Sequence, residues 1–157
     1  MKTELTPKPM RASHITIAQL MQLEQANLLG NVHGGWIMKL VDEAGALAGM
    51  RHAQQRVVTV AIDQMVFRQP IRNGDLVILN AEVTYTGRTS MEVEVQVVAE
   101  NPITGERTHT NTAYLVYVAM GDDGKPVAVP PLIAENPAEK ARMQAAKERQ
   151  QRRLAQK

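Results

Sequence analysis

The chain has 157 residues, which is the size of one domain, and 44% of them are hydrophobic, as in a globular protein. It contains no cysteine and no apolar run of the roughly 18 residues that a membrane helix requires. The first residues, MKTELTPKPMRASH, lack the apolar core of a signal peptide. Neither a disulfide framework nor secretion nor a membrane partner is indicated, so we expect a cytoplasmic protein.

The net charge of +2 conceals an uneven distribution. Residues 1–137 contain eleven basic and fourteen acidic residues, whereas residues 138–157 contain seven and two, so the end of the chain carries about +5. Such a basic end could contact nucleic acid, a membrane surface or phosphates, but it is more often simply a solvated surface. Because only 3% of the residues are aromatic, there is little to stack on bases, and we expect no nucleic-acid partner.

The first predicted element is a short strand, SHITIAQLM (13–21), in which apolar and polar residues alternate. After a loop, a helix is predicted from about Gly34 to His52, because apolar residues recur at helical spacing and also fill the other sides. A helix that is apolar nearly all round is a buried one. Its second half, Ala44 to Gly49, is rich in small residues, which allow close approach of a sheet or of a second chain.

Period-two alternation and β-branched residues replace the helical spacing after this helix and predict four longer strands. The predicted strands are residues 56–67, 75–87, 91–100 and 108–120. Turn-forming residues lie at 73–75, 86–88 and 102–105, and such short links imply antiparallel hairpins. One buried helix with one antiparallel sheet predicts an α+β fold in which the curved sheet wraps around the helix.

The last strand has apolar residues, Ala113, Leu115 and Tyr117, on a face that we expect to lie outside, so we predict contacts with other copies there. An extended, proline-containing segment follows, and the polar sequence after it predicts a C-terminal helix. We therefore expect a single domain over residues 1–137 and a basic helical extension over residues 138–157.

The stretch NLLGNVHGGWIMKLVDEAG (27–45) places a carboxylate, Asp42, inside the apolar helix, where burial is unfavourable. The predicted helix begins at Gly34 and Gly35, where free backbone N–H groups and the positive end of the helix dipole favour an anion or oxyanion. Asp42 lies on nearly the same helix face as Gly35 but about 10 Å further along the axis. These groups of one chain cannot touch the same atom, but a second protomer could close the gap.

Each of these residues also has a structural explanation. The glycines could form only a tight turn, and Asp42 could be a satisfied core carboxylate or lie on an exposed stripe. Asn27 is most often a turn residue or loop cap, and His33 is either a general base or a loop residue. Other catalytic motifs are absent from the sequence, including a cysteine nucleophile, GxSxG, HExxH, a P-loop and a GxGxxG after a strand. The four histidines have no metal-ligand spacing, so we expect no metal site.

Four segments resemble the hotdog-fold acyl-CoA thioesterases of the cytosolic acyl-CoA hydrolase type. They are N-x2-G-x2-HGGWIMKLVDEAG (27–45), RVVTVAIDQMVFRQPIRNGD (56–75), YTGRTSMEVEVQV (85–97) and VPPLIAENPAEKAR (129–142). Together they span almost the whole chain in order. The resemblance implies a hotdog fold, in which an antiparallel sheet wraps a long central helix, and dimers that assemble further. We expect a homodimer as the minimal active unit and a homohexamer, a trimer of dimers, as the assembly.

In this family the site lies across the dimer interface and combines an asparagine from the loop before the helix with an aspartate from the partner's helix. Asn27 and Asp42 occupy these positions. The resemblance implies hydrolysis of fatty acyl-CoA to a fatty acid and CoA, with Asp42 as general base or nucleophile and Asn27 positioning water or substrate. The N–H groups of Gly34 and Gly35 would polarise the thioester oxygen. Coenzyme A enters as part of the substrate and product, and no other cofactor is implied.

The resemblance also implies a set of CoA contacts. The implied contacts are Thr59, Val60, Gly87, Arg88, Thr89 and Ser90, with Arg88 toward a phosphate. Arg88 could instead be a plain charge at a hairpin tip, and the basic tail could reach the 3′-phosphate. Two other functions stay open: a non-catalytic acyl-CoA or acyl-carrier binding protein on the same scaffold, and a hotdog dehydratase. Release of free thiol from acyl-CoA would separate them.

Overall fold

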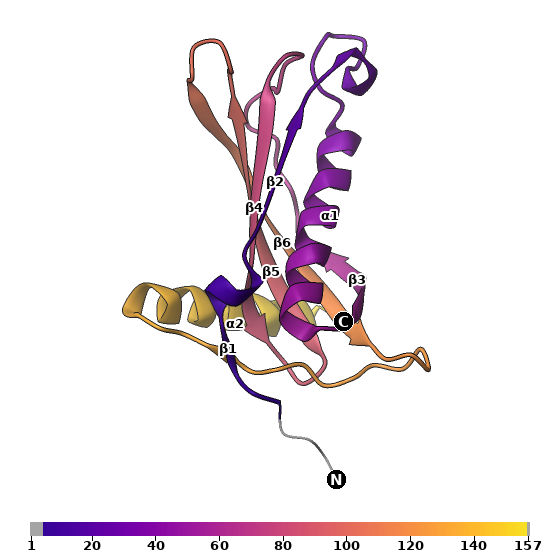
Figure 1. The fold of residues 1–157 in the computed structure, drawn as a ribbon, viewed down its shortest axis with the longest axis vertical. Coiled ribbons are helices and arrows are strands. Elements are labelled where there is room, and N and C mark those ends of the chain that lie inside the picture. The colour runs from indigo at the N-terminus through magenta and orange to yellow at the C-terminus, as the bar shows by residue number, and fades with distance from the viewer. Residues whose placement is uncertain (1–4, 157) are drawn as a thin grey trace.

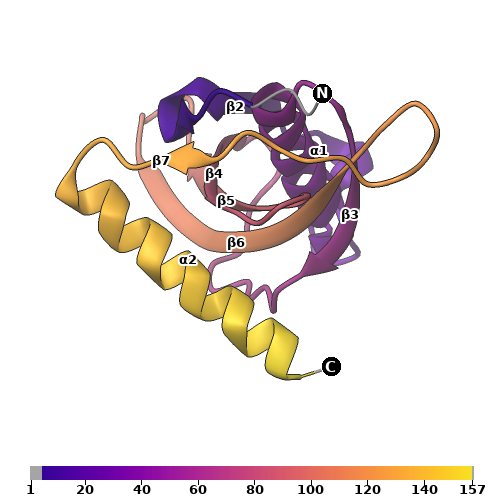
Figure 2. The same ribbon diagram turned by 90° about the horizontal axis from the view of Figure 1, so that it is seen from below.

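The computed structural model describes residues 5–156. A five-stranded antiparallel sheet curls around helix α1 (Gly34–Ala53), while helix α2 (Pro137–Ala155) lies outside the sheet (Figures 1 and 2). The strands are β2 (Ile15–Leu20), β3 (Arg56–Ile62), β4 (Leu76–Thr86), β5 (Ser90–Glu100) and β6 (Arg107–Met120), and their order across the sheet is β2, β4, β5, β6, β3. The predicted α+β hotdog arrangement is confirmed. No helix within residues 5–156 is long and apolar enough to cross a membrane.

Four short elements complete the fold. They are β1 (Lys8–Pro9), the 3-10 helices η1 (Met10–Ser13) and η2 (Leu23–Gln25), and β7 (Leu132–Ile133). Strands β1 and β7 pair in parallel, so the segment after β6 returns beside the N-terminal segment below the sheet (Figure 1).

The core lies between α1 and the inner face of the sheet. Strand β6 contributes Ala113, Leu115 and Tyr117 to it, and all three are at most 1% exposed. The prediction that these residues contact other copies is therefore wrong. The alternation was correct, but Val116 on the opposite face is also apolar, so the pattern alone did not show which face points inward.

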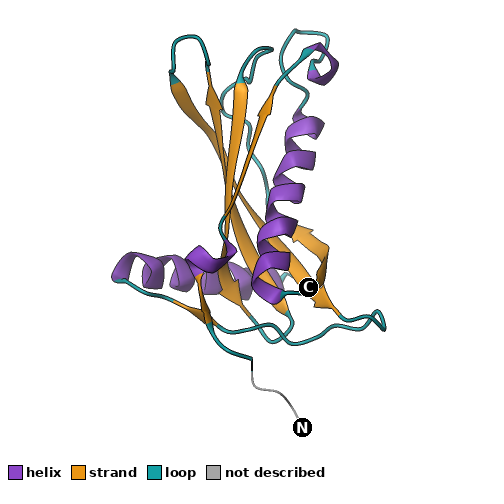
Figure 3. Ribbon diagram, in the orientation of Figure 1, coloured by secondary structure: helices purple, strands orange, loops and turns teal. Residues whose placement is uncertain are grey.

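The hairpins β4–β5 and β5–β6 are present as predicted, but β3 and β4 do not form one. Strand β3 pairs with β6 at the edge of the sheet and ends at Ile62, five residues earlier than predicted. Residues 63–75 then run past the start of α1 toward β4, where Arg72 forms a bridge with Asn31 (Figure 3). A connecting segment of this length can cross the fold, so the turn at residues 73–75 did not have to join neighbouring strands.

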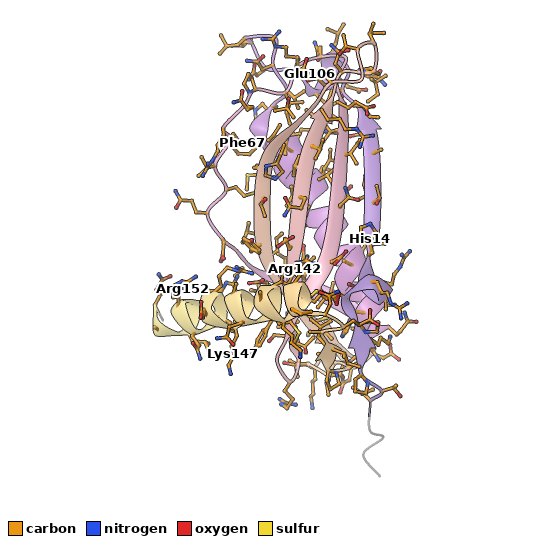
Figure 4. All side chains as sticks on the ribbon, turned by 90° about the vertical axis from the view of Figure 1, so that its left-hand side faces the viewer. His14, Phe67, Glu106, Arg142, Lys147 and Arg152 are labelled. Carbon is orange, nitrogen blue, oxygen red and sulfur yellow. The ribbon has the colours of Figure 1, made fainter. Side chains whose placement is uncertain are left out.

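Helix α2 is held to the sheet by arginine–carboxylate pairs. Arg142 bonds Glu82 and Glu94, both at 3.1 Å, and Figure 4 shows this residue where α2 passes over the strands. Arg149 and Arg153 bind Glu92 at 2.8 and 2.6 Å, respectively. This side of the basic helix is thus not a solvated surface. The boundary that we draw between domain and extension at residue 137 stays a prediction.

Candidate functional site

Asp42 lies on the side of α1 that faces β3, and it is partly buried. Its Oδ1 accepts hydrogen bonds from the Thr59 hydroxyl at 2.8 Å and from the Tyr117 hydroxyl at 3.0 Å. Within residues 5–156, no donor is bonded to its Oδ2. Asp42 is therefore neither a fully satisfied core carboxylate nor a freely solvated one, since one oxygen is held and the other is open.

The sheet register explains why both hydroxyls reach the same carboxylate. Thr59 on β3 and Tyr117 on β6 are directly opposed in the antiparallel pairing, so their side chains point to the same face. The register shifts between Thr59 and Ala61, which places Val60 in a bulge, a feature common beside active sites. The structure thus brings Thr59, predicted as a CoA contact, into direct contact with Asp42.

Asn27 has the predicted role of a loop cap. Its Oδ1 accepts from the backbone N–H groups of Leu29 at 2.9 Å and Asn31 at 3.3 Å. Its Nδ2 has no acceptor among the residues that the structure describes, so it is available to donate. No hydrogen bond joins Asn27 to Asp42 of the same chain.

His33 caps the start of α1, a role that the sequence pattern does not indicate. Its Nδ1 accepts the Gly35 N–H at 3.0 Å. Histidine is not among the preferred capping residues, so only its place directly before the helix could have indicated this. The Gly34 N–H has no acceptor in the described part of the chain, and a Cβ at Gly34 would lie 3.7 Å from the Phe67 ring. The free donor at the helix start is therefore Gly34, while Gly35 is occupied by His33.

The other predicted CoA contacts lie in the turn between β4 and β5. Ser90 opposes Val118 in the register, next to the row that joins Met91, Tyr117 and Thr59. Two strand spacings separate this end of β5 from β3, which is roughly 10 Å. The structure thus leaves Gly87, Arg88, Thr89 and Ser90 apart from Asp42 but on the same end of the sheet. Arg88 is exposed, and within residues 5–156 it forms no ion pair.

A set of half-exposed apolar residues lies on and around β3, and we call it the apolar stripe. It consists of Met38, Leu47, Val58, Val60, Ile62, Val66 and Phe67, each between 40% and 55% exposed. These residues belong to α1, to β3 and to the segment after β3. Strand β3 is also an edge strand, so one row of its backbone groups is unpaired. Exposed apolar residues gathered beside an open sheet edge are typical of a protein–protein interface.

A family model and curated proteins of known family resemble this chain in sequence. Residues 29–106 match the family model described as the thioesterase superfamily. The cytosolic acyl coenzyme A thioester hydrolase of Rattus norvegicus is 34% identical over 149 residues, covering 92% of this chain and 39% of that protein. This chain thus spans about two fifths of the length of the mammalian relatives that it matches.

Two solved structures share the complete fold. An apo-hexameric acyl-CoA thioesterase superposes with a TM-score of 0.92 at 37% identity, covering 97% of both chains. The acyl-CoA hydrolase of Staphylococcus aureus, solved with butyryl coenzyme A, coenzyme A and coenzyme A disulfide, superposes with a TM-score of 0.88 at 34% identity, covering 95% of this chain and 91% of that one. With the same fold over nearly its full length and a matching family model, this chain belongs to the thioesterase superfamily.

Proposed function

We propose that this protein hydrolyses fatty acyl-CoA thioesters to a fatty acid and free CoA, at two equivalent sites of a homodimer. The observation that carries the proposal is the state of Asp42, whose Oδ1 is held by two hydroxyls while its Oδ2 has no donor within residues 5–156. A carboxylate in this setting can act on a water molecule or on a carbonyl carbon. The similarity to acyl-CoA thioesterases and hydrolases supports the substrate class.

In the proposed reaction, Asp42 takes a proton from water while the water oxygen attacks the thioester carbon. The tetrahedral intermediate then breaks its carbon–sulfur bond, and the proton passes from Asp42 to the departing sulfur. Direct attack by Asp42 on the thioester carbon would instead break the carbon–sulfur bond, release the CoA thiolate and give a mixed anhydride. Water then cleaves the anhydride to the fatty acid and the Asp42 carboxylate, and the proton set free neutralises the thiolate. The amide of Asn27 and the N–H of Gly34 are the donors that we assign to the thioester oxygen. The N–H of Gly35 joins them only if the His33 ring moves away from it.

The site requires a second protomer, because Asn27 and the start of α1 lie too far from Asp42 of the same chain. We propose that two β3 edges pair with each other, which would satisfy their open backbone groups and bury the apolar stripe. A two-fold symmetric dimer then contains two sites, each with Asn27 from one chain and Asp42 from the other. We also propose that three such dimers assemble into a homohexamer and that the protein is cytoplasmic.

Coenzyme A would lie along the end of the sheet that carries the β4–β5 turn. Arg88 is exposed there and is the side chain that we assign to a phosphate. The C-terminal helix is a weaker candidate for the 3′-phosphate, because Arg142, Arg149 and Arg153 are already paired with carboxylates of the sheet and of the segment after β3.

The first test is thiol release by the purified protein from acyl-CoAs of different chain lengths. Binding without thiol release would favour the non-catalytic acyl-CoA binding protein. Asp42→Ala and Asn27→Ala should each lower turnover by at least ~100-fold, on the scale of acid–base and positioning effects. Near wild-type turnover in a correctly assembled Asp42→Ala protein would remove Asp42 from the mechanism.

Mixing these two inactive proteins tests the shared site. If Asn27 and Asp42 come from different chains, reassembly after unfolding together should restore about a quarter of wild-type turnover, since each site draws its two residues from two independent chains. A site built within one chain predicts no recovery on mixing. Each variant refolded alone is the control and should stay inactive.

A further inference from the structure

Tyr117 approaches helix α1 through a gap that glycine creates. The side chain is fully buried, and it comes from β6, three residues before the strand ends. A Cβ at Gly45 would overlap the Tyr117 hydroxyl, and a Cβ at Gly49 would lie 3.9 Å from the Tyr117 Cβ. Two glycines one turn apart therefore allow the ring to lie directly against the helix, three residues beyond Asp42.

The single hydrogen of the Tyr117 hydroxyl has two acceptors within reach, both on Asp42, and the charged carboxylate oxygen is the stronger one. The hydroxyl oxygen lies 3.0 Å from Oδ1 and 3.0 Å from the backbone carbonyl oxygen of the same residue. Burial, and then the nearby Asp42 charge, raise the pKa of Tyr117 above its usual value of 10.0, so the hydroxyl remains a donor throughout the neutral range. A buried hydroxyl without a partner would be destabilising, and here the partner is the carboxylate proposed to react.

Tyr117 and Thr59 together occupy one oxygen of Asp42. A carboxylate oxygen has two lone-pair positions, and two hydroxyl donors at 3.0 and 2.8 Å fill both positions on Oδ1. Oδ2 keeps its own lone pairs for another group. The same donors restrict rotation of the carboxylate, because a turn about its terminal bond would break both hydrogen bonds.

We propose that Tyr117 is a positioning residue for Asp42, which fixes Oδ1 so that Oδ2 is the atom that takes the proton or attacks the thioester. Tyr117 is fully buried, so it does not touch the substrate and acts only through Asp42. The effect on turnover rests on the proposed function, whereas the effect on the Asp42 carboxylate does not.

The kinetic test is Tyr117→Phe, which keeps the ring and removes the hydroxyl. We expect kcat to fall about 10- to 100-fold, the range for a lost hydrogen bond to a charged group, with KM little changed. The acid limb of the kcat–pH profile should move to higher pH, because a carboxylate that loses a donor binds a proton more readily. The control is Tyr114→Phe on the same strand, whose ring lies 3.7 Å below Arg149 on the outer face and should leave kcat unchanged.

A second measurement does not depend on turnover. Carbon-13 NMR of the carboxyl groups, with the Asp42 signal assigned through Asp42→Asn, follows the titration of this group directly. In Tyr117→Phe the midpoint should move to higher pH, because the carboxylate loses a hydrogen-bond donor. An unmoved midpoint, with or without a loss of stability, would show that Tyr117 only fills space and would overturn the proposal. If the wild-type protein releases no thiol, the proposed function fails, but this titration still decides the positioning.

Discussion

Replacing Arg149 by methionine tests whether the C-terminal helix is held by a buried carboxylate. Glu92 is 1% exposed, so water does not solvate its carboxylate and hydrogen-bond partners must stabilise it instead. Arg149 binds it through two nitrogens at 2.8 and 3.0 Å, Arg153 binds it at 2.6 Å, and the Thr84 hydroxyl donates to it at 2.6 Å. Arg149→Met removes two of these four hydrogen bonds and leaves the carboxylate buried.

The expected loss of stability follows from these contacts. Removing one partner of a buried ion pair costs about 3–5 kcal/mol. Because Arg153 and Thr84 still bond Glu92 in the variant, we expect a smaller loss of about 2–3 kcal/mol from the ion pair. The Arg149 guanidinium also lies 3.7 Å above the Tyr114 ring, which adds about 0.5–1 kcal/mol. The total of about 3 kcal/mol is a large share of the ~5–15 kcal/mol that stabilises a typical domain.

The assay is urea unfolding at a fixed protomer concentration, because assembly makes the midpoint depend on concentration. The control is Arg152→Met, a neighbouring exposed residue that forms no ion pair in the described part of the chain. It should change stability by no more than about 0.5 kcal/mol. If Arg149→Met and Arg152→Met unfold at the same urea concentration, the Glu92 network contributes no net stability. Turnover per folded protomer should not change, since Arg149 does not contact Asp42.

Two further outcomes are expected. His52 is fully buried, and its Nε2 lies 2.7 Å from the Pro130 carbonyl oxygen. Burial lowers the pKa of His52 from the usual 6.5. The free energy of unfolding should therefore be highest above pH 6.5 and decrease as the pH falls below it, because the unfolded chain then binds a proton that the folded chain does not. In His52→Gln the free energy of unfolding should fall less steeply with decreasing pH, by up to about 1.4 kcal/mol per pH unit. Urea unfolding between about pH 7.5 and 5.5 measures this slope, and equal slopes in both proteins would contradict the prediction. Val60→Asp places a carboxylate on the open β3 edge and should yield dissociated, inactive protomers in sedimentation. Unchanged assembly would exclude this edge as the interface.

Much of the fold could be predicted from local pattern. Alternation identified the strands, and a helix apolar on nearly every side identified the buried element. The pattern could not show that β3 lies at the edge beside β6, because this depends on how residues 63–75 cross the fold. It also could not orient β6, where Val116 and Leu115 are both apolar and point to opposite faces.

The site was predicted less completely. Asp42 and Asn27 were found because a carboxylate in an apolar helix and an amide in a preceding loop are visible in the sequence, and the family resemblance paired them. Tyr117 was missed, since it lies 75 residues from Asp42 and was interpreted as an outward-facing residue. The small residues around Gly45 indicate that a sheet or a second chain approaches the helix closely, but they do not show which side chain does so.

The open groups of one protomer link assembly to catalysis. Under the proposed function, the free oxygen of Asp42, the free amide of Asn27 and the unpaired edge of β3 are all completed by the same event, the pairing of two chains. A change that only weakens the pairing should lower the number of complete sites but leave the chemistry of the remaining sites unaltered. Turnover per protomer would then fall with dilution at constant KM, whereas loss of the Tyr117 hydroxyl would lower turnover at every concentration. These two dependences separate defects of assembly from defects of positioning.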